Sequence, residues 1–240
     1  MPTVKKPVRE RRTYDQECGL AFALDVVGER WTLLIIRELL LRPRRYKELL
    51  DALPGIGTNL LADRLSALTD AGLIVSTDPG RRTAGYALTP LGESLREPIL
   101  GLARFGLTVG AEQPRSTEAV TRSSWATLAI EAMVDDRRAP DVDEVYQFEV
   151  DAEVFHVSVV GGHAQTRGGP AEDPTLVVST DAATFFDLGL RRLDPVEAVV
   201  GGAVRVHGTA SAMPRCLRLL GLSNGQPTTP ASRRKAVPVP

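Results

Sequence analysis

Five polar residues in the first half of the chain have the types and spacing of groups that recognise a partner by hydrogen bonding. They fall in an expected helix beginning at Thr58, in which leucines 61, 65 and 68 share one face. The rest of that helix carries the polar set: Thr58, Asn59, Asp63, Arg64 at the boundary, and Ser66. Asparagine can pair bidentately with adenine, aspartate can accept from cytosine, and a threonine at a helix start suits a phosphate. The pattern is typical of a helix that contacts nucleic acid.

Basic residues lie on both sides of this helix in the sequence. Five of them are candidates for phosphate contacts: Arg44, Arg45, Lys47, Arg81 and Arg82. Residues 1–110 carry 16 Lys and Arg against 13 Asp and Glu, and residues 111–240 carry 13 against 17. The net charge of −1 therefore conceals a basic front half, which indicates either attraction to phosphates or a solvated charged face.

Periodicity predicts the elements that would position these side chains. Helices are expected from Cys18 to Gly28 with Leu20, Ala23, Leu24 and Val27 at helical spacing, from Leu33 to Leu41 with Thr32 as cap, from Tyr46 to Leu53, and from Thr58 to Gly72. A hairpin of residues 73–75 and 86–88 follows, with a basic tip. A last helix, residues 89–109, would carry a continuous apolar stripe, and Pro98 would bend it or disrupt it locally. Helices followed by a two-stranded ribbon are the order of a winged helix-turn-helix domain.

Three segments carry a specific resemblance: GERWTLLIIREL, LPGIGTNLLADRL and YALTPLG. With them, residues from about Cys18 to Gly110 resemble the HxlR family of bacterial winged-helix transcription regulators, relatives of the MarR group. The resemblance implies a homodimer that places two recognition helices on double-stranded DNA at a palindromic operator. Terminal helices such as residues 91–109 would form the dimer contact.

Cys18 stands where the family often has a cysteine, which in some members senses electrophiles or oxidants. Gly19 departs from that pattern, because proline commonly follows this cysteine. Asp15 and Glu17 are expected to disfavour the reactive thiolate. We therefore expect Cys18 to be an inert, small core residue, with redox sensing as the alternative.

The rear half changes from helical to strand periodicity. Residues 111–123 are expected to form a linker, and Ser124 to cap a helix. Strands are expected at 146–150, 155–159, 175–179 and 203–207, with 161–174 as a long turn and with helices opened by Asp181, Asp194 and Ser211. Residues 1–13 are expected to be a flexible basic arm, and 224–240 a disordered tail.

This order of elements predicts an α+β layer in which helices cover one face of a sheet. Residues 120–222, with segments such as VYQFEVDAEVFHVSVVGG, look like a sterol-carrier-protein-type domain. That resemblance implies a cavity for a small hydrophobic effector, a lipid or an acyl chain. The candidate lining residues are Trp125, Met133, Phe148, Phe155, Phe185 and Phe186, any of which would also serve as plain core.

Catalytic, metal and cofactor hypotheses find little support. His156, His163 and His207 are widely separated, although His156 and His207 lie on expected strands and could meet. We expect no metal, no cofactor and no catalytic residue, since serine-hydrolase and nucleotide-loop motifs are missing. No apolar run is long enough to span a membrane, and two cysteines make no disulfide framework, so we expect a cytoplasmic protein.

The fold class predicted is thus α+β: an N-terminal winged helix-turn-helix domain, residues 14–110, and a sterol-carrier-like domain, residues 124–223. The function expected is a dimeric, DNA-binding repressor whose second domain binds an effector or supports dimerisation. One alternative is a lipid or acyl-chain carrier that uses the winged helix only as a dimerisation scaffold. A metal-assisted enzyme built on the rear domain is the third hypothesis.

Overall fold

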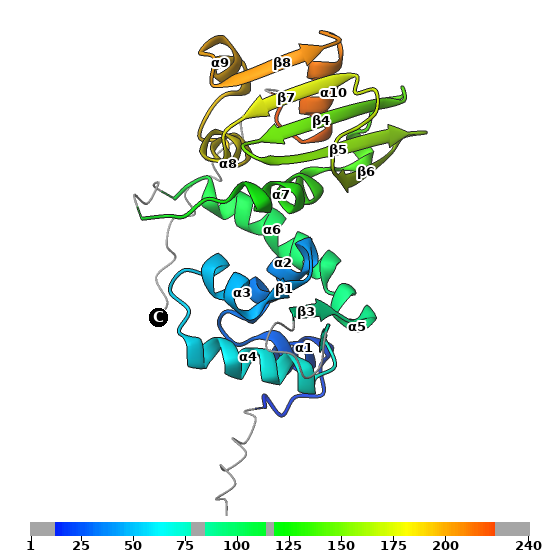
Figure 1. Ribbon diagram of the computed structural model, residues 1–240. Helices are drawn as coiled ribbons and strands as arrows, with labels where there is room; N and C mark the ends of the chain where they lie inside the picture. Colours follow the sequence, from blue (N-terminus) through cyan, green and yellow to red (C-terminus); the bar gives the residue numbers. More distant parts are fainter. Residues whose placement is uncertain (1–12, 78–84, 114–117, 224–240) are drawn as a thin grey trace, which may run out of the picture. The chain divides into compact units, whose positions relative to one another are not determined.

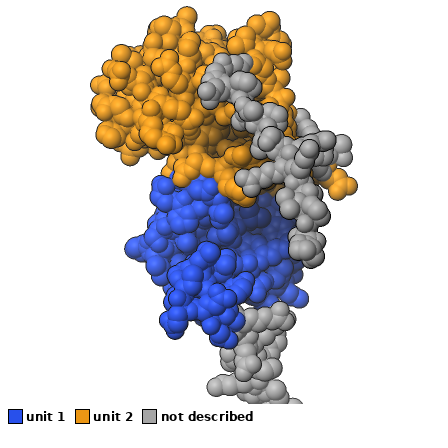
Figure 2. Space-filling model, turned by 180° about the vertical axis from the view of Figure 1, so that it is seen from behind, with its two compact units in different colours: residues 1–102 blue, residues 103–240 orange. Residues whose placement is uncertain are grey.

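The computed structural model describes residues 13–77, 85–113 and 118–223 of the chain. These form two compact units, residues 1–102 and 103–240, coloured separately in Figure 2. The division falls inside one helix, α6, which runs from Arg96 to Gly110. Each unit has its own core, so each is described by itself.

Unit 1 consists of helices around a small three-stranded sheet (Figure 1). Its elements are α1 (Gly19–Val27), α2 (Thr32–Leu41), β1 (Arg44–Arg45), α3 (Tyr46–Ala52), α4 (Thr58–Asp70), β2 (Ile74–Ser76), β3 (Gly85–Leu88), α5 (Pro90–Glu93) and the start of α6. The sheet is antiparallel with the order β1-β3-β2, and Ile74 lies opposite Leu88. The winged-helix order is confirmed, and β1 adds a strand that the sequence did not predict.

The helix starts in unit 1 differ in part from expectation. Trp31, with a φ of 77°, is the N-cap residue of α2. Thr32 is the first residue of the helix, where it is buried, and does not cap it. Along α1, Ala21 and Val27 are buried, while Leu20 and Leu24 of the apolar residues at helical spacing are exposed. Helical spacing shows which apolar side chains share a face, but it does not show whether the core of the same unit covers that face.

Residues 89–109 form two helices, so the expected helix is interrupted and not bent. The helix is interrupted at Ser94 and Leu95, between α5 and α6. Pro98 lies in the first turn of α6. A first-turn residue has no intrahelical partner for its N–H, so proline fits there without a bend. Of the residues in the expected apolar stripe, Ile99 is buried, while Leu91, Leu102 and Val109 are exposed.

Unit 2 is a five-stranded sheet with helices on one face (Figure 1). After α6 come η1 (Ser123–Trp125), α7 (Ala126–Met133), η2 (Asp136–Arg138), β4 (Glu144–Val150), β5 (Glu153–Val160), β6 (His163–Gly168), β7 (Leu176–Thr180), α8 (Ala182–Gly189), α9 (Pro195–Val200), β8 (Val204–Gly208) and α10 (Ala212–Leu219). The strand order is β6-β5-β4-β7-β8, with β4 and β7 parallel and the other pairs antiparallel.

Alternation along the strands sends one set of side chains into the core of unit 2. Tyr146, Phe148 and Val150 of β4 are buried with Phe155 and Val157 of β5. They pack against apolar residues of α7, α8 and α10. The expected strands are confirmed, and so is an α+β arrangement of helices on a sheet.

Two caps in unit 2 are confirmed and two other expectations fail. Asp181 accepts a hydrogen bond from the N–H of Thr184 (2.9 Å), and Asp194 accepts from the N–H of Val196 (2.8 Å), as expected for helix caps. Ser124 lies inside η1 and does not cap α7. The expected turn at 161–174 contains the edge strand β6, whose polar residues hide the alternation that marks a half-buried strand.

A buried polar network joins β4 to α10. Tyr146, which is fully buried, donates a short hydrogen bond to the carboxylate of Glu144, and Arg215 donates to the same carboxylate with both Nε (3.0 Å) and Nη2. Arg215, foremost, and then Tyr146 lower the pKa of Glu144, whereas burial raises the pKa of Tyr146 well above its ordinary value. Glu144 therefore stays charged and satisfies two donors at once.

We expect Glu144→Gln to loosen this end of unit 2. The neutral amide cannot satisfy both buried donors, which costs about 1–3 kcal/mol and accelerates hydrogen exchange of β4 and α10 by roughly 5- to 150-fold at pH 7. The lowered pKa makes the charged form stabilising above the unfolded pKa of about 4.3, and that stabilisation is lost as pH falls through the folded value. The difference in free energy of unfolding between the parent protein and Glu144→Gln should therefore shrink below about pH 4.

Glu172→Gln is the matched control, since Glu172 is exposed in the connection between β6 and β7. It should leave the exchange of β4 and α10 unchanged. Equal exchange in the parent and in Glu144→Gln would contradict a stabilising role for the network.

Candidate functional site

The exposed face of α4 carries four of the predicted site residues. Leu61, Leu65 and Leu68 are 0 to 2% exposed and hold the helix on the core of unit 1. Four of the polar residues lie in solvent on the remaining surface of the helix: Thr58, Asn59, Asp63 and Ser66. Gly57, not Thr58, precedes the first turn, so the hydroxyl of Thr58 is not used as a cap. These groups are available to a partner.

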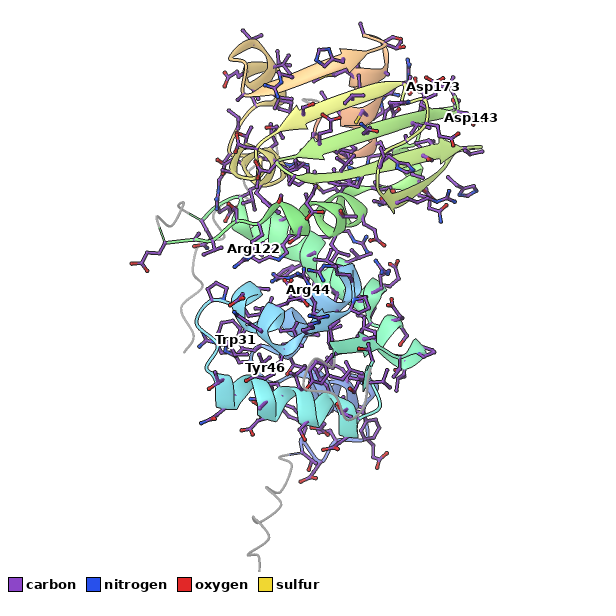
Figure 3. All side chains as sticks on the ribbon, in the orientation of Figure 1. Trp31, Arg44, Tyr46, Arg122, Asp143 and Asp173 are labelled. Carbon is purple, nitrogen blue, oxygen red and sulfur yellow. The ribbon has the colours of Figure 1, made fainter. Side chains whose placement is uncertain are left out.

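The start of α4 is fixed by α3. The hydroxyl of Tyr46, the first residue of α3, donates to the carbonyl of Thr58 at 2.6 Å. The N–H of Arg45 donates to Glu48 at 2.7 Å and closes the start of α3. That N–H, and then Arg42, hold the pKa of Glu48 below its usual range. Figure 3 marks Tyr46 in the space between α3 and α4.

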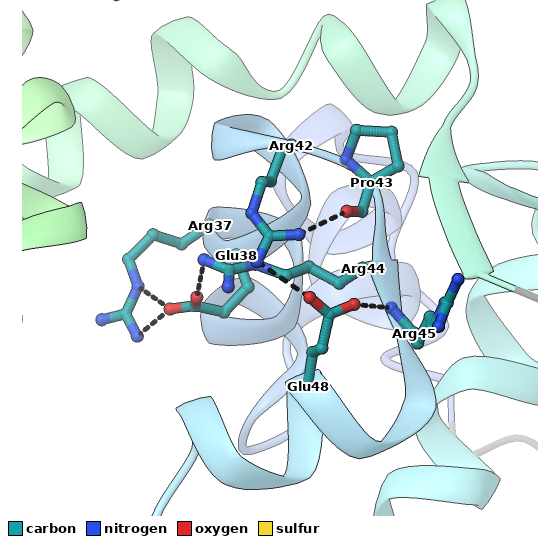
Figure 4. Close-up of polar contacts among 7 residues, drawn as sticks. All are labelled: Arg37, Glu38, Arg42, Pro43, Arg44, Arg45 and Glu48. Carbon is teal, nitrogen blue, oxygen red and sulfur yellow. Dashed lines mark hydrogen bonds and ion pairs between the residues drawn. The ribbon is translucent and has the colours of Figure 1, made fainter. Parts of the chain in front are cut away.

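The basic side chains predicted to contact phosphates differ in their exposure and in their ion pairs within the protein. Arg45 and Lys47 are exposed. The Arg44 side chain is only 11% exposed, and its Nη2 lies 3.0 Å from Glu38, a fully buried carboxylate that Arg37 also contacts (Figure 4). Arg44 is thus committed to an internal ion pair, because a buried charge needs a partner, and the expectation of a solvent-facing cation is corrected.

Arg64 is also turned inward. Its Nη2 contacts Glu29 at 2.7 Å and its Nε donates to the carbonyl of Arg30 at 3.2 Å, so the side chain is only 19% exposed. The sequence reasoning missed Glu29 because no spacing rule links residues that lie 35 positions apart. Arg42, which was also missed, is exposed and ion-paired with Glu48. The arginines predicted for the hairpin tip, Arg81 and Arg82, lie outside the described residues.

Unit 2 contains an apolar cavity of about 60 Å³. Met133, Phe148 and Phe185 line it as predicted, together with Cys216 and several leucines. Trp125, Phe155 and Phe186 are not among its lining residues, and Phe155 is a buried core side chain stacked on Phe148 at 5.4 Å. A dry cavity of about 150 Å³ can hold benzene in another protein, so this one suits only a small apolar group unless it expands.

The remaining chemical candidates do not converge. Within the described ranges, no group of three or more His, Cys, Asp or Glu side chains could hold a metal ion. His156 faces the carbonyl of Gly169, with Nδ1 at 2.9 Å, and His163 lies near Asp136. Among the described residues, no helix has both the length and the apolar character to cross a membrane.

Cys18 was expected to be buried and to have a disfavoured thiolate, and the structure differs on both points. The residue is exposed at the start of α1 and is not part of the core. The backbone N–H groups of Ala21, foremost, and of Leu20 lower the pKa of its thiol. Asp15 and Glu17 do not set the direction, because sequence proximity does not measure the reach of a carboxylate.

We expect Cys18 to react with iodoacetamide at lower pH than an ordinary thiol. Its alkylation rate should reach half-maximum below about pH 8.5, because backbone N–H groups favour the thiolate. Cys216 is the internal control: burial raises the pKa of its thiol to about 12, so it should stay unmodified in the folded protein. Mass spectrometry of the two peptides measures both rates, and a midpoint for Cys18 at or above that of a model thiol would contradict the assignment.

Comparison with known proteins bears on unit 1 and the whole of α6. The model of the HxlR-like helix-turn-helix family matches residues 26–113. An uncharacterized HTH-type transcriptional regulator of Mycobacterium tuberculosis is 42% identical over 88 residues, which are 35% of this chain and 54% of that protein. YvaP of Bacillus subtilis, of the same description, is 35% identical over 83 residues, 33% of this chain and 74% of that protein.

A solved structure, the quinone-bound YodB of Bacillus subtilis, is 28% identical and covers 37% of this chain and 96% of that one, with a TM-score of 0.33. The chain spans about half the length of the Mycobacterium relative. The family match ends at residue 113, so the sterol-carrier resemblance of unit 2 stays a prediction. Through its front half, the chain belongs to the HxlR-like helix-turn-helix family.

Proposed function

We propose that the protein is a DNA-binding transcription regulator, acting as a repressor, and that α4 is its recognition helix. The observation that carries this is the exposed polar face of α4, held outward by the buried leucines, in a chain of the HxlR-like family. A major groove admits one α-helix, and base edges present donors and acceptors that such a face can match.

The proposed DNA contacts are of two kinds, those to base edges and those to phosphates. Asn59 and Asp63 would read base edges, and Ser66 would support them with its hydroxyl. Thr58 and the helix start would meet a phosphate. Arg45, Lys47, Arg81 and Arg82 would supply attraction to phosphates that does not depend on the DNA sequence. Arg44 and Arg64 are left out of this set, since both are engaged within the protein.

We further propose a homodimer on a palindromic operator. Large apolar side chains stand exposed on α1 and on α6, and these are Leu20, Phe22, Leu24, Leu102, Phe105 and Val109. An exposed apolar face on a helix is favoured as a protein contact surface. Two-fold symmetry would place half-sites about one helical turn of DNA apart.

The cavity of unit 2 supports the proposal of an effector. Its lining is almost wholly apolar, with Met133, Phe148 and Phe185 among its walls. Its volume favours a compact, uncharged compound over a long acyl chain. Such a compound would change DNA affinity only through a different affinity for two conformations of the protein, typically about 1–3 kcal/mol.

We expect base and phosphate contacts to respond differently to substitution. Asn59→Ala should cost about 1–3 kcal/mol on the DNA upstream of the protein's own gene and little on random DNA. Arg45→Ala with Lys47→Ala, or Arg81→Ala with Arg82→Ala, should weaken both and flatten the salt dependence by about 0.9 for each phosphate that is no longer neutralised. Titrations by fluorescence anisotropy at several salt concentrations measure both effects.

The control is Glu172→Ala, an exposed substitution in unit 2 that should alter binding to neither DNA. An equal loss on both DNAs for Asn59→Ala would overturn its role in base recognition. Absence of salt-dependent binding by the parent protein would overturn the proposed function itself.

The cavity makes a separate prediction. Xenon under pressure, an apolar probe smaller than benzene, should raise the melting temperature of the protein, and Val178→Phe should abolish that shift because Val178 lines the cavity. Val177→Phe is the matched control: successive residues of β7 point to opposite faces of the sheet, so it adds the same ring away from the cavity. A shift that survives Val178→Phe would show that the compound binds elsewhere.

A further inference from the structure

We propose that the turn from Glu29 to Thr32 is a positioning element that sets the orientation of α4, and that Arg64 acts through this turn without touching DNA. The inference rests on the proposed function, because it assigns how the recognition helix is held. It also changes the role expected for Arg64 from a contact residue to a support.

The turn itself adopts a backbone that its sequence does not favour. The N–H of Thr32 donates to the carbonyl of Glu29 at 3.1 Å, which closes a four-residue turn. Trp31 is the third residue of that turn, with φ 77° and ψ −21°. Those are the angles of a type II turn, where glycine is usual and a bulky side chain is a genuine outlier. Such a conformation persists only where surrounding contacts hold it.

Two attachments hold this turn to the helix-turn-helix. Arg64, in the middle of α4, bonds the carboxylate of Glu29 and the carbonyl of Arg30 together. The ring of Trp31 lies against the connection between α3 and α4, where Gly55 has a φ of 92° and a Cβ would stand 3.7 Å from the ring edge. Figure 3 marks Trp31 beside that connection.

The guanidinium of Arg30 completes the arrangement by lying over the Trp31 ring, 5.3 Å from its centroid. Three consecutive residues therefore contact both the turn that precedes α4 and the middle of α4. With Tyr46 fixing the carbonyl of Thr58, the recognition helix is held at its approach, its first turn and its centre. A change in any one of these contacts would rotate or shift the face that carries Asn59.

Charge distinguishes positioning from direct contact. If Arg64 contacted phosphates, Glu29 would compete with the DNA for it, and removing the carboxylate would strengthen binding to any DNA. If Arg64 positions α4, removing Glu29 releases the helix and weakens binding to the cognate site alone. The two roles predict opposite signs for the same substitution.

The test compares Glu29→Gln, Arg64→Met and the double variant in the full chain, on DNA upstream of its own gene and on random DNA. Each single variant should weaken cognate binding about tenfold, as a mismatched base pair does, with less than about a twofold change on random DNA. The double variant should lose no more than either single one, because both remove one interaction. Tighter binding by Glu29→Gln, or a salt dependence flattened by about 0.9 in Arg64→Met, would overturn the proposal.

Glu93→Gln is the matched control, since it makes the same charge change in unit 1 at an ion pair with Arg96. It should leave the ratio of cognate to random affinity unchanged. Trp31→Gly isolates the ring, because glycine tolerates the positive φ, and it should lose cognate affinity as the charge variants do. An unchanged affinity ratio in Trp31→Gly would also contradict the proposal.

A second readout needs no DNA. In a Trp125→Phe background, the emission of Trp31 should shift to longer wavelength in Arg64→Met and not in Glu93→Gln, because only the former frees the turn. Failure of the parent to bind DNA would defeat the proposed function, whereas an unshifted Trp31 emission would defeat the positioning role on its own.

Discussion

Burial of one face of α4 is the constraint on which the candidate site depends. Leu61, Leu65 and Leu68 leave almost no surface to water, so the helix cannot roll without exposing them. The polar residues that remain outside therefore occupy a fixed direction, and their chemistry suits base edges and phosphates. Contacts from Tyr46, Arg64 and Trp31 refine a placement that apolar burial has already decided in outline.

Unit 2 follows a different physical plan. Its sheet buries one face beneath α7, α8 and α10, and the buried carboxylate of Glu144 joins β4 to α10 through Tyr146 and Arg215. The same apolar packing leaves a small cavity beside Phe148 and Phe185. The network ties β4 to α10 at one place in unit 2, whereas the cavity is lined almost wholly by apolar side chains.

The elements could be predicted from the sequence where a local rule operates. The period of α4, the caps at Asp181 and Asp194 and the alternation in β4 and β5 all depend on neighbours within a few residues. Three other features could not be predicted from the sequence, because they depend on residues far apart in the chain or on a backbone conformation that is rare for the residue type. Glu29 meets Arg64 only in the folded chain, Trp31 occupies a turn position that favours glycine, and Arg44 finds the buried Glu38. The edge strand β6 was not predicted because its side chains are polar. The lowered pKa of Cys18 was not predicted because backbone N–H groups, not nearby acids, set its direction.

If α4 is the recognition helix of a dimer, α4 of each protomer reads one half of a symmetric DNA site. Selection of bound fragments from a random-sequence DNA pool by the purified full chain, followed by sequencing, tests it most directly. We expect enrichment of an inverted repeat whose half-site centres lie about one helical turn, roughly 10 base pairs, apart. A pool that stays random after repeated rounds, or that yields one half-site without its inverted copy, would contradict it.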